Sequence, residues 1–209
     1  TLIHGGPFAN IAHGCNSVIA TKTALKMGDY AVTEAGFGAD LGAEKFLDIK
    51  CRMADLHPSC VVIVATIRAL KMHGGVDKKD LAIENVDALL KGITNLEKHI
   101  ENIGKYNLPY VVAINKFGTD TLNEVNALEK WAKDHNHPVA LSEVFAKGGE
   151  GGIELAKKVV EEINLHDGAE KFAPIYDTNL PIKDKSSAIC TKIYGATKVE
   201  FTTTAKNQM

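Results

Sequence analysis

A glycine-rich stretch early in the chain carries the residues best suited to chemistry. Residues 33–46 read TEAGFGADLGAEKF and follow the short apolar run Tyr30–Val32. The stretch opens with the carboxylate of Glu34, and three glycines then allow the backbone to bend tightly and approach a ligand closely. The aromatic residue Phe37 lies among these glycines. The pattern is typical of a parallel strand that delivers chemical groups into a phosphate-handling site.

The carboxylate of Glu34 is a candidate ligand for Mg²⁺, because hard cations prefer carboxylate oxygens. The alternative is that Glu34 only caps a helix near Asp40. The glycines that follow Glu34 favour the magnesium interpretation.

Four apolar runs read as buried strands that must position these groups: Tyr30–Thr33, Cys60–Ala65, Tyr110–Ile114 and Val139–Leu141. Two of them are rich in valine and isoleucine without alternation, which predicts parallel strands covered on both faces. Ligands of open parallel sheets bind beyond the carboxyl ends of the strands. Each of these ends is followed by polar or glycine-rich residues, so we expect one site there.

Basic residues and an amide follow the second and third strands. Arg68 and Lys71 are candidates for neutralising a phosphate or carboxylate, with solvated helix residues as the alternative. Asn115 and Lys116 are similar to the base-reading NKxD of GTPases, although an ordinary turn explains them equally well. Gly118 occupies the aspartate position of that motif, so guanine selectivity is not supported.

The fourth strand is followed by Ser142, Phe145, Lys147 and the run GGEGG at 148–152. Free N–H groups in this run, including that of Gly149, suit an anion such as a nucleotide phosphate, although the glycines alone also suit a simple turn. The rings of Phe37 and Phe145 lie in polar loops without an obvious core. They either stack on a flat heteroaromatic ligand or pack inward as loop anchors.

Helical patterns separate the strands and complete the predicted fold. They cover residues 80–103, 121–134, 152–164 and 185–194, and the second begins with a capping box, Thr121 to Glu124. Alternating strands and helices predict an α/β fold: a mostly parallel sheet with helices on both faces, an incomplete three-layer core like that of P-loop NTPases. We expect this core over residues 1–165 and a connector with a short helix over residues 166–209.

Composition excludes several function classes. A net charge of −2 argues against nucleic-acid binding. No apolar run approaches ~18 residues, so we expect no membrane span. There is no basic-then-apolar leader, which together with the composition predicts a cytoplasmic protein. Four cysteines without a CxxC pair predict reduced thiols, and His135-x-His137 predicts a solvated loop.

Seven stretches together resemble the formate–tetrahydrofolate ligases (10-formyltetrahydrofolate synthetases), and they cover almost the whole chain in family order. The stretches are HGGPFANIAHGCNS at 4–17, TEAGFGADLGAEKF at 33–46, DIKCR at 48–52, VATIRALKMHGG at 64–75, NLEKHIENIGK at 95–105, AINKFGTDT at 113–121 and SEVFAKGGEGGIELAKKV at 142–159. The resemblance implies an ATP-dependent ligase that joins formate to tetrahydrofolate through formyl phosphate. It also implies Mg²⁺, stimulation by a monovalent cation, and a homotetrameric parent protein.

The resemblance assigns roles to individual residues. It implies that Phe37 and Phe145 clamp the folate ring, with phenylalanine at the second position where relatives often have tryptophan. Leu141 and Ser142 fall beside the clamp, and Gly42 falls near the phosphate or formyl end. Ala9 and Asn10 line the same pocket. Asn115 belongs to the base-side loop, and with Lys116, Lys147 and Gly149 it forms the candidate nucleotide-binding set.

The chain has no GxxxxGK[ST] phosphate loop. Family members carry that loop, with basic catalytic residues, in an N-terminal segment, and they continue into a further C-terminal domain. We therefore expect an internal fragment whose main catalytic residues lie elsewhere and which has no turnover alone. The alternatives are a non-catalytic folate- or nucleotide-binding module and a nucleotide switch related to GTPases.

Overall fold

The structure is a computed structural model that describes residues 16–209. The chain divides into two compact units, residues 58–171 and a second unit built from the chain up to residue 57 with residues 172–209. The unit of residues 58–171 extends past residue 165, where the sequence predicts a domain boundary. That boundary stays a prediction. Ala9 and Asn10 lie outside the described residues.

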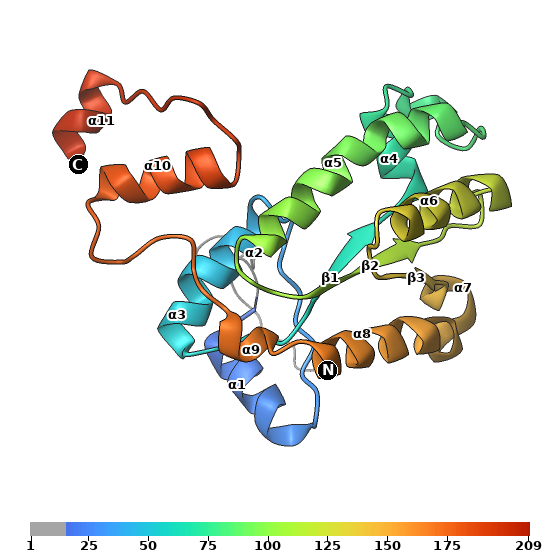
Figure 1. Cartoon of the computed structure of the whole chain (residues 1–209), viewed down its shortest axis with the longest axis horizontal. Coiled ribbons are helices and arrows are strands. Elements are labelled where there is room, and N and C mark those ends of the chain that lie inside the picture. Colours follow the sequence, from blue (N-terminus) through green and yellow to red (C-terminus); the bar gives the residue numbers. More distant parts are fainter. Residues whose placement is uncertain (1–15) are drawn as a thin grey trace. The chain divides into compact units, whose positions relative to one another are not determined.

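Unit 58–171 is an α/β layer structure, which confirms the predicted fold class (Figure 1). Its elements, in chain order, are β1 (Val61–Ala65), α4 (Ile67–His73), the 3₁₀ turn η2 (Lys78–Asp80), α5 (Val86–Gly104), β2 (Tyr110–Asn115), α6 (Leu122–Asp134), β3 (Val139–Ser142), α7 (Val144–Lys147), the 3₁₀ turn η3 (Gly148–Gly152), α8 (Ile153–Leu165) and α9 (Gly168–Lys171). The three strands lie within one or two residues of their predicted positions.

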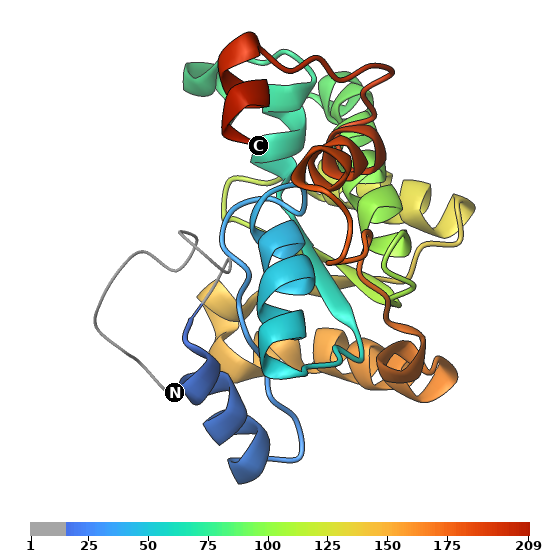
Figure 2. The same ribbon diagram turned by 90° about the vertical axis from the view of Figure 1, so that its left-hand side faces the viewer.

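The strands form one parallel sheet in the order β1-β2-β3. Helices α5 and α6 lie on one face of this sheet and α8 lies on the other (Figures 1 and 2). Strand β2 occupies the centre, and its residues from Val111 to Ile114 are buried. Three layers with a central valine- and isoleucine-rich strand are the arrangement that the sequence predicts.

Strand β1 departs from the prediction that both strand faces are covered. Val62 and Val64 are exposed, whereas Ile63 and Ala65 on the opposite face are buried. The reason is that α8 packs chiefly on β2 and β3. The apolar run of β1 shows no alternation of apolar and polar residues. It therefore did not reveal that only one face of this strand is covered.

Local signals set the helix ends. The capping box forms as predicted at the start of α6, where Thr121 and Glu124 bond to each other's backbone N–H groups. Helix α5 starts later than predicted, because the side chain of Asn85 accepts a hydrogen bond from the N–H of Ala88 and caps the helix there.

A buried ion pair joins α4 to α6. The amine of Lys71 lies 2.7 Å from a carboxylate oxygen of Glu124, and both side chains are fully buried. Lys71 also donates to the backbone oxygen of Ile83, and Glu124 accepts from the N–H of Asn85. Burial opposes ionisation of Glu124, but these hydrogen bonds outweigh it and hold the pKa of its carboxyl below the usual value.

Glycines bring the backbones of α4 and α5 into direct contact. A Cβ added at Gly92 would lie 1.9 Å from the oxygen of Leu70, an atom that cannot turn aside. We expect Gly92→Ala to lower the free energy of unfolding by about 3 kcal/mol, measured by urea denaturation. Gly104→Ala in the same helix is the matched control, since nothing lies within 4 Å of its added Cβ. An equal effect of both substitutions would contradict the packing argument.

The second unit is mainly helical in its described part. Its elements are α1 (Val18–Met27), α2 (Gly42–Lys45), the π-helical turn η1 (Phe46–Lys50), α3 (Cys51–Ala54), α10 (Ile182–Lys192) and α11 (Thr203–Gln208). Three of these, α2, η1 and α3, run on without a break. Lys50 in the π turn is buried and donates to the backbone oxygen of Asn16 and the hydroxyl of Thr21.

The predicted strand at Tyr30–Thr33 is wrong: these residues belong to no strand. Tyr30 and Val32 are exposed, and no ladder partner pairs with them among residues 16–209. An apolar run of four residues becomes a strand only where a neighbouring strand takes up its backbone hydrogen bonds.

The described cysteines Cys51, Cys60 and Cys190 are free thiols, as predicted for them, and Cys15 lies outside the described residues. Over residues 16–209 no helix combines the length and the apolar character that crossing a bilayer requires.

Candidate functional site

Two neighbouring strand ends bring the predicted nucleotide loop and part of the predicted folate wall together. Asn115 at the end of β2 is the register partner of Ser142 at the end of β3. The N–H of Lys116 donates to the oxygen of Ser142 over 3.1 Å and extends the pairing past the strands. Leu141 is half-buried and Ser142 is buried. Both are therefore held in place by packing at this edge of the sheet.

Glu143 links the two basic residues of this edge, and the sequence analysis did not single it out. Its carboxylate lies 3.1 Å from the amine of Lys116 and 2.5 Å from that of Lys147. Hydrogen bonds from Lys147 and then Lys116 hold the pKa of Glu143 below its usual value. An anion arriving here competes with one carboxylate for two ammonium groups. The missed signal was a carboxylate directly after a strand end, between two lysine-bearing loops.

The loop after β2 is closed by its own carboxylate. Asp120 accepts a hydrogen bond from the N–H of Phe117 over 2.8 Å and is buried. Gly118, between them, occupies the position where a base-reading aspartate would be needed. Asp120 therefore fixes the loop's shape through Oδ2, while its Oδ1 is buried without a hydrogen-bond partner in the described part of the chain.

Phe145 projects from the start of the glycine-rich run. Its side chain is 88% exposed on the short helix α7. Gly148 follows with φ of 61°, a conformation that glycine adopts readily, and Gly149 is exposed. Of the two interpretations of this ring, inward packing as a loop anchor is wrong, because the ring faces solvent.

Phe37 is also exposed, at 75%, in the unit that carries α2. It has φ of 62°, the left-handed conformation that costs a non-glycine residue about 1 kcal/mol or more. Inward packing is therefore wrong for this ring too. A bulky apolar side chain held exposed on an unfavourable backbone is a pattern that clusters at ligand-binding loops.

Gly42 closes the loop that carries Phe37. Its N–H donates to the oxygen of Gly38 over 3.0 Å. An added Cβ would lie 1.3 Å from the oxygen of Gly36, so only glycine fits here. Gly42 thus contacts both other glycines of the predicted motif, Gly36 and Gly38, and fixes the loop's shape.

Glu34 is exposed in the same loop. Within residues 16–209 no group of three or more histidine, cysteine or acidic side chains could hold a metal. Mg²⁺ commonly binds through one or two protein carboxylates plus phosphate oxygens and waters, and a single exposed carboxylate fits that mode. Glu34 as a magnesium ligand remains a prediction.

Of the two basic residues after β1, Lys71 departs from the prediction. Lys71 was expected to face an anion or solvent, but it is buried in the ion pair with Glu124. Arg68 is exposed, as a solvated helix residue would be. The two residues lie about one helical turn apart, and the sequence did not show that only Lys71 is buried.

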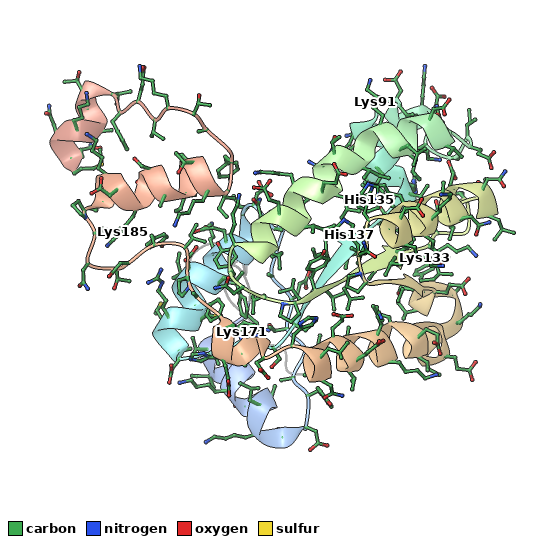
Figure 3. The ribbon with its side chains drawn as sticks, in the orientation of Figure 1. Lys91, Lys133, His135, His137, Lys171 and Lys185 are labelled. Carbon is green, nitrogen blue, oxygen red and sulfur yellow. The ribbon has the colours of Figure 1, made fainter. Side chains whose placement is uncertain are left out.

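A cavity of about 650 Å³ opens at the other end of the sheet, and none of the predicted site residues lines it. Here Tyr110 hydrogen-bonds His137 over 2.7 Å, and His137 stacks on His135 (Figure 3). His135 is exposed, as the predicted solvated loop requires, whereas His137 is half-buried. Lys158, Lys171 and Glu162 contribute charges of both signs to the wall, so its charge does not select a ligand class.

A family model described as formate–tetrahydrofolate ligase matches residues 1–209, the whole chain. The chain belongs to the formate–tetrahydrofolate ligase family. The resemblance inferred from the seven stretches is thereby confirmed. As a member of the formate–tetrahydrofolate ligase family, the chain carries the residues of its predicted clamp in two different units, Phe37 in one and Phe145 in the other. Their pairing around a folate ring stays a prediction.

Proposed function

We propose that this chain supplies the folate wall and the base side of the nucleotide site of a ligase that joins formate to tetrahydrofolate. In this reaction ATP phosphorylates formate, and the N10 atom of the folate then takes the formyl group from formyl phosphate. Mg²⁺ and a monovalent cation assist, and the parent protein is a homotetramer in the cytoplasm. Family membership and the exposure of Phe37 and Phe145 support the proposal.

Each predicted residue has a task in this reaction. Phe37 and Phe145 stack on the flat pterin, beside Leu141 and Ser142. Gly42, Ala9 and Asn10 leave room for the reacting formyl end. Asn115 and Lys116 contact the base side of the nucleotide, while Lys147 and the N–H of Gly149 attract its phosphates.

The proposal is supported most by one observation: the phenyl rings of Phe37, in a loop, and Phe145, on the short helix α7, are largely exposed in a member of the formate–tetrahydrofolate ligase family. In water, such rings lose the free energy that burial would give them, on the order of 2 kcal/mol each. A folate ring between them recovers it.

Calorimetric titration of the chain with tetrahydrofolate, and separately with Mg²⁺–ATP, tests the proposal. We expect tetrahydrofolate to bind. ATP should bind more weakly, because the chain has no phosphate loop to hold the triphosphate. Absence of tetrahydrofolate binding would contradict the proposal.

Turnover of the chain alone is expected to be undetectable. Without phosphate-loop N–H groups and their lysine, little stabilises the charge that develops at the γ-phosphate. An assay of 10-formyltetrahydrofolate formation from formate, ATP and tetrahydrofolate measures this. Clear product formation by the chain alone would show that the phosphate-binding groups are present in it after all.

A further inference from the structure

We infer that Lys50 is a positioning residue for the glycine-rich loop of residues 33–42, and that it acts through Asn16 and Thr33. The effect of Lys50 on tetrahydrofolate binding rests on the proposed function, because it assumes that Phe37 in this loop contacts the folate. All of these residues belong to one unit of the structure.

The amine of Lys50 is buried against oxygen atoms at the start of α1. It donates to the backbone oxygen of Asn16 over 2.8 Å, to the side-chain oxygen of Asn16 over 3.0 Å and to the hydroxyl of Thr21 over 2.8 Å. An ammonium group has three N–H donors, so these three oxygens match its donors in number. The side chain is fully buried, and a buried charge is tolerated only with such hydrogen bonds. Lys50 therefore fixes the start of α1 against the π turn.

These hydrogen bonds set the direction of the Asn16 amide. Its Oδ1 accepts from the amine of Lys50 over 3.0 Å and from the hydroxyl of Thr21 over 2.9 Å. Two donors that face one atom identify it as the amide oxygen, so the NH₂ group lies on the other side. That NH₂ group donates to the hydroxyl of Thr33 over 3.2 Å. Turning the amide would break bonds on both sides, so Lys50 determines which group of Asn16 meets Thr33.

Thr33 is one of two anchors of the glycine-rich loop. The other is Gly42, whose N–H donates to the oxygen of Gly38 over 3.0 Å. Glu34 and Phe37 lie between the two anchors in the sequence. A loop that is fastened at both ends loses less conformational entropy when it binds a ligand. Release of Thr33 would free the end of the loop nearest to Glu34 and Phe37.

The π turn is a firm support for the amine of Lys50, its last residue. The carboxylate of Asp48, in the same turn, accepts from the backbone N–H of Ile175 over 3.0 Å. The guanidinium of Arg52, one residue beyond the turn's C-cap, donates to the backbone oxygen of Tyr176. The helix is thus tied to distant parts of the chain on both sides of Lys50. Turns of this kind occur frequently at functional sites.

Substitutions of Thr33 test the last bond of this network. Thr33→Val removes the hydroxyl at nearly constant volume, whereas Thr33→Ser keeps it. In calorimetric titrations with tetrahydrofolate we expect Thr33→Val to bind about fivefold more weakly, the effect of one hydrogen bond. Thr33→Ser should bind as the wild type does. Thr23→Val is the matched control, since the hydroxyl of Thr23 donates to the oxygen of Ile19 within α1. Wild-type affinity in Thr33→Val would overturn the inference.

A double-mutant cycle tests whether Lys50 acts through Thr33. Lys50→Met keeps a similar volume without donors, and it should weaken tetrahydrofolate binding at least about fivefold. Lys50→Met combined with Thr33→Val should bind no more weakly than Lys50→Met alone, because both substitutions break one path. Multiplication of the two effects would contradict the inference. Should Lys50→Met not fold, Thr21→Val replaces it in the cycle, with the same expectation.

Backbone ¹⁵N relaxation of residues 34–38 tests the loop without any ligand. We expect order parameters near about 0.85 in the wild type and in Thr23→Val, and below about 0.6 in Thr33→Val. Equal order in Thr33→Val and the wild type would show that the bond does not hold the loop, and the inference would be wrong. If the wild type does not bind tetrahydrofolate, the proposed function fails, and the order parameters still decide whether the network positions the loop.

Discussion

Replacing Lys71 with methionine is expected to lower the free energy of unfolding by about 3–5 kcal/mol. Methionine fills a similar volume, so the loss comes from electrostatics rather than from a cavity. It leaves the carboxylate of Glu124 fully buried without its cation. The hydrogen bond from the N–H of Thr121 cannot compensate, because it is already formed in the wild type.

 Glu124 keeps its bonds to Asn85 and Thr121 in this variant, and these neutral donors cannot replace an ammonium group. Urea denaturation measures the loss.

The pH should change the loss of unfolding free energy in Lys71→Met in a defined direction. In the wild type the low pKa of Glu124 contributes stability that is present above about pH 4.5 and is lost as the pH falls below it. In Lys71→Met the same carboxyl is buried without its cation, so its pKa rises and protonation relieves the variant. The difference between the two proteins therefore narrows in acid. A constant difference would contradict this account.

Lys98→Met is the matched control for the buried pair. Lys98 forms an ion pair with Glu101 on the surface of α5, at 2.9 Å and with both side chains largely solvated. Exposed pairs of this kind contribute less than about 1 kcal/mol. A loss of similar size in both methionine variants would mean that burial of the Lys71–Glu124 pair has no special effect.

Replacing Phe37 with alanine should weaken tetrahydrofolate binding at least about tenfold, which corresponds to about 1.4 kcal/mol. Stacking contributes about 1 kcal/mol beyond the apolar area that the ring buries on the ligand. Because the ring is 75% exposed in the free chain, its removal should leave the free energy of unfolding within about 0.5 kcal/mol. Calorimetry and urea denaturation of the same preparation separate the two effects.

Three further variants identify stacking as the cause. Phe37→Leu keeps an apolar side chain but no flat face, and it should bind almost as weakly as the alanine variant. Phe145→Trp enlarges the second face and should raise the affinity. Ile19→Ala removes an exposed apolar side chain from α1 and should change nothing. Wild-type affinity in Phe37→Ala would exclude this ring from the folate site.

The strands of the sheet, the start of α6 and the family could all be predicted from the amino-acid sequence alone. Apolar runs located β1, β2 and β3, and the central strand β2 has the continuous apolar residues that a strand buried on both faces needs. The capping box at Thr121 placed the start of α6 for an equally local reason. Seven stretches in family order identified the family, and the family model matches the whole chain.

Which polar residues are available for chemistry became visible only in the folded chain. Lys71 and Lys116 both follow strands and look alike in the sequence, yet one is buried against Glu124 and the other lies at the sheet edge beside Glu143. The run Tyr30–Thr33 has the composition of a strand but pairs with none. Burial, ion pairing and strand pairing each depend on residues that are distant in the chain. Local sequence patterns do not predict which distant residues will be in contact in the folded chain.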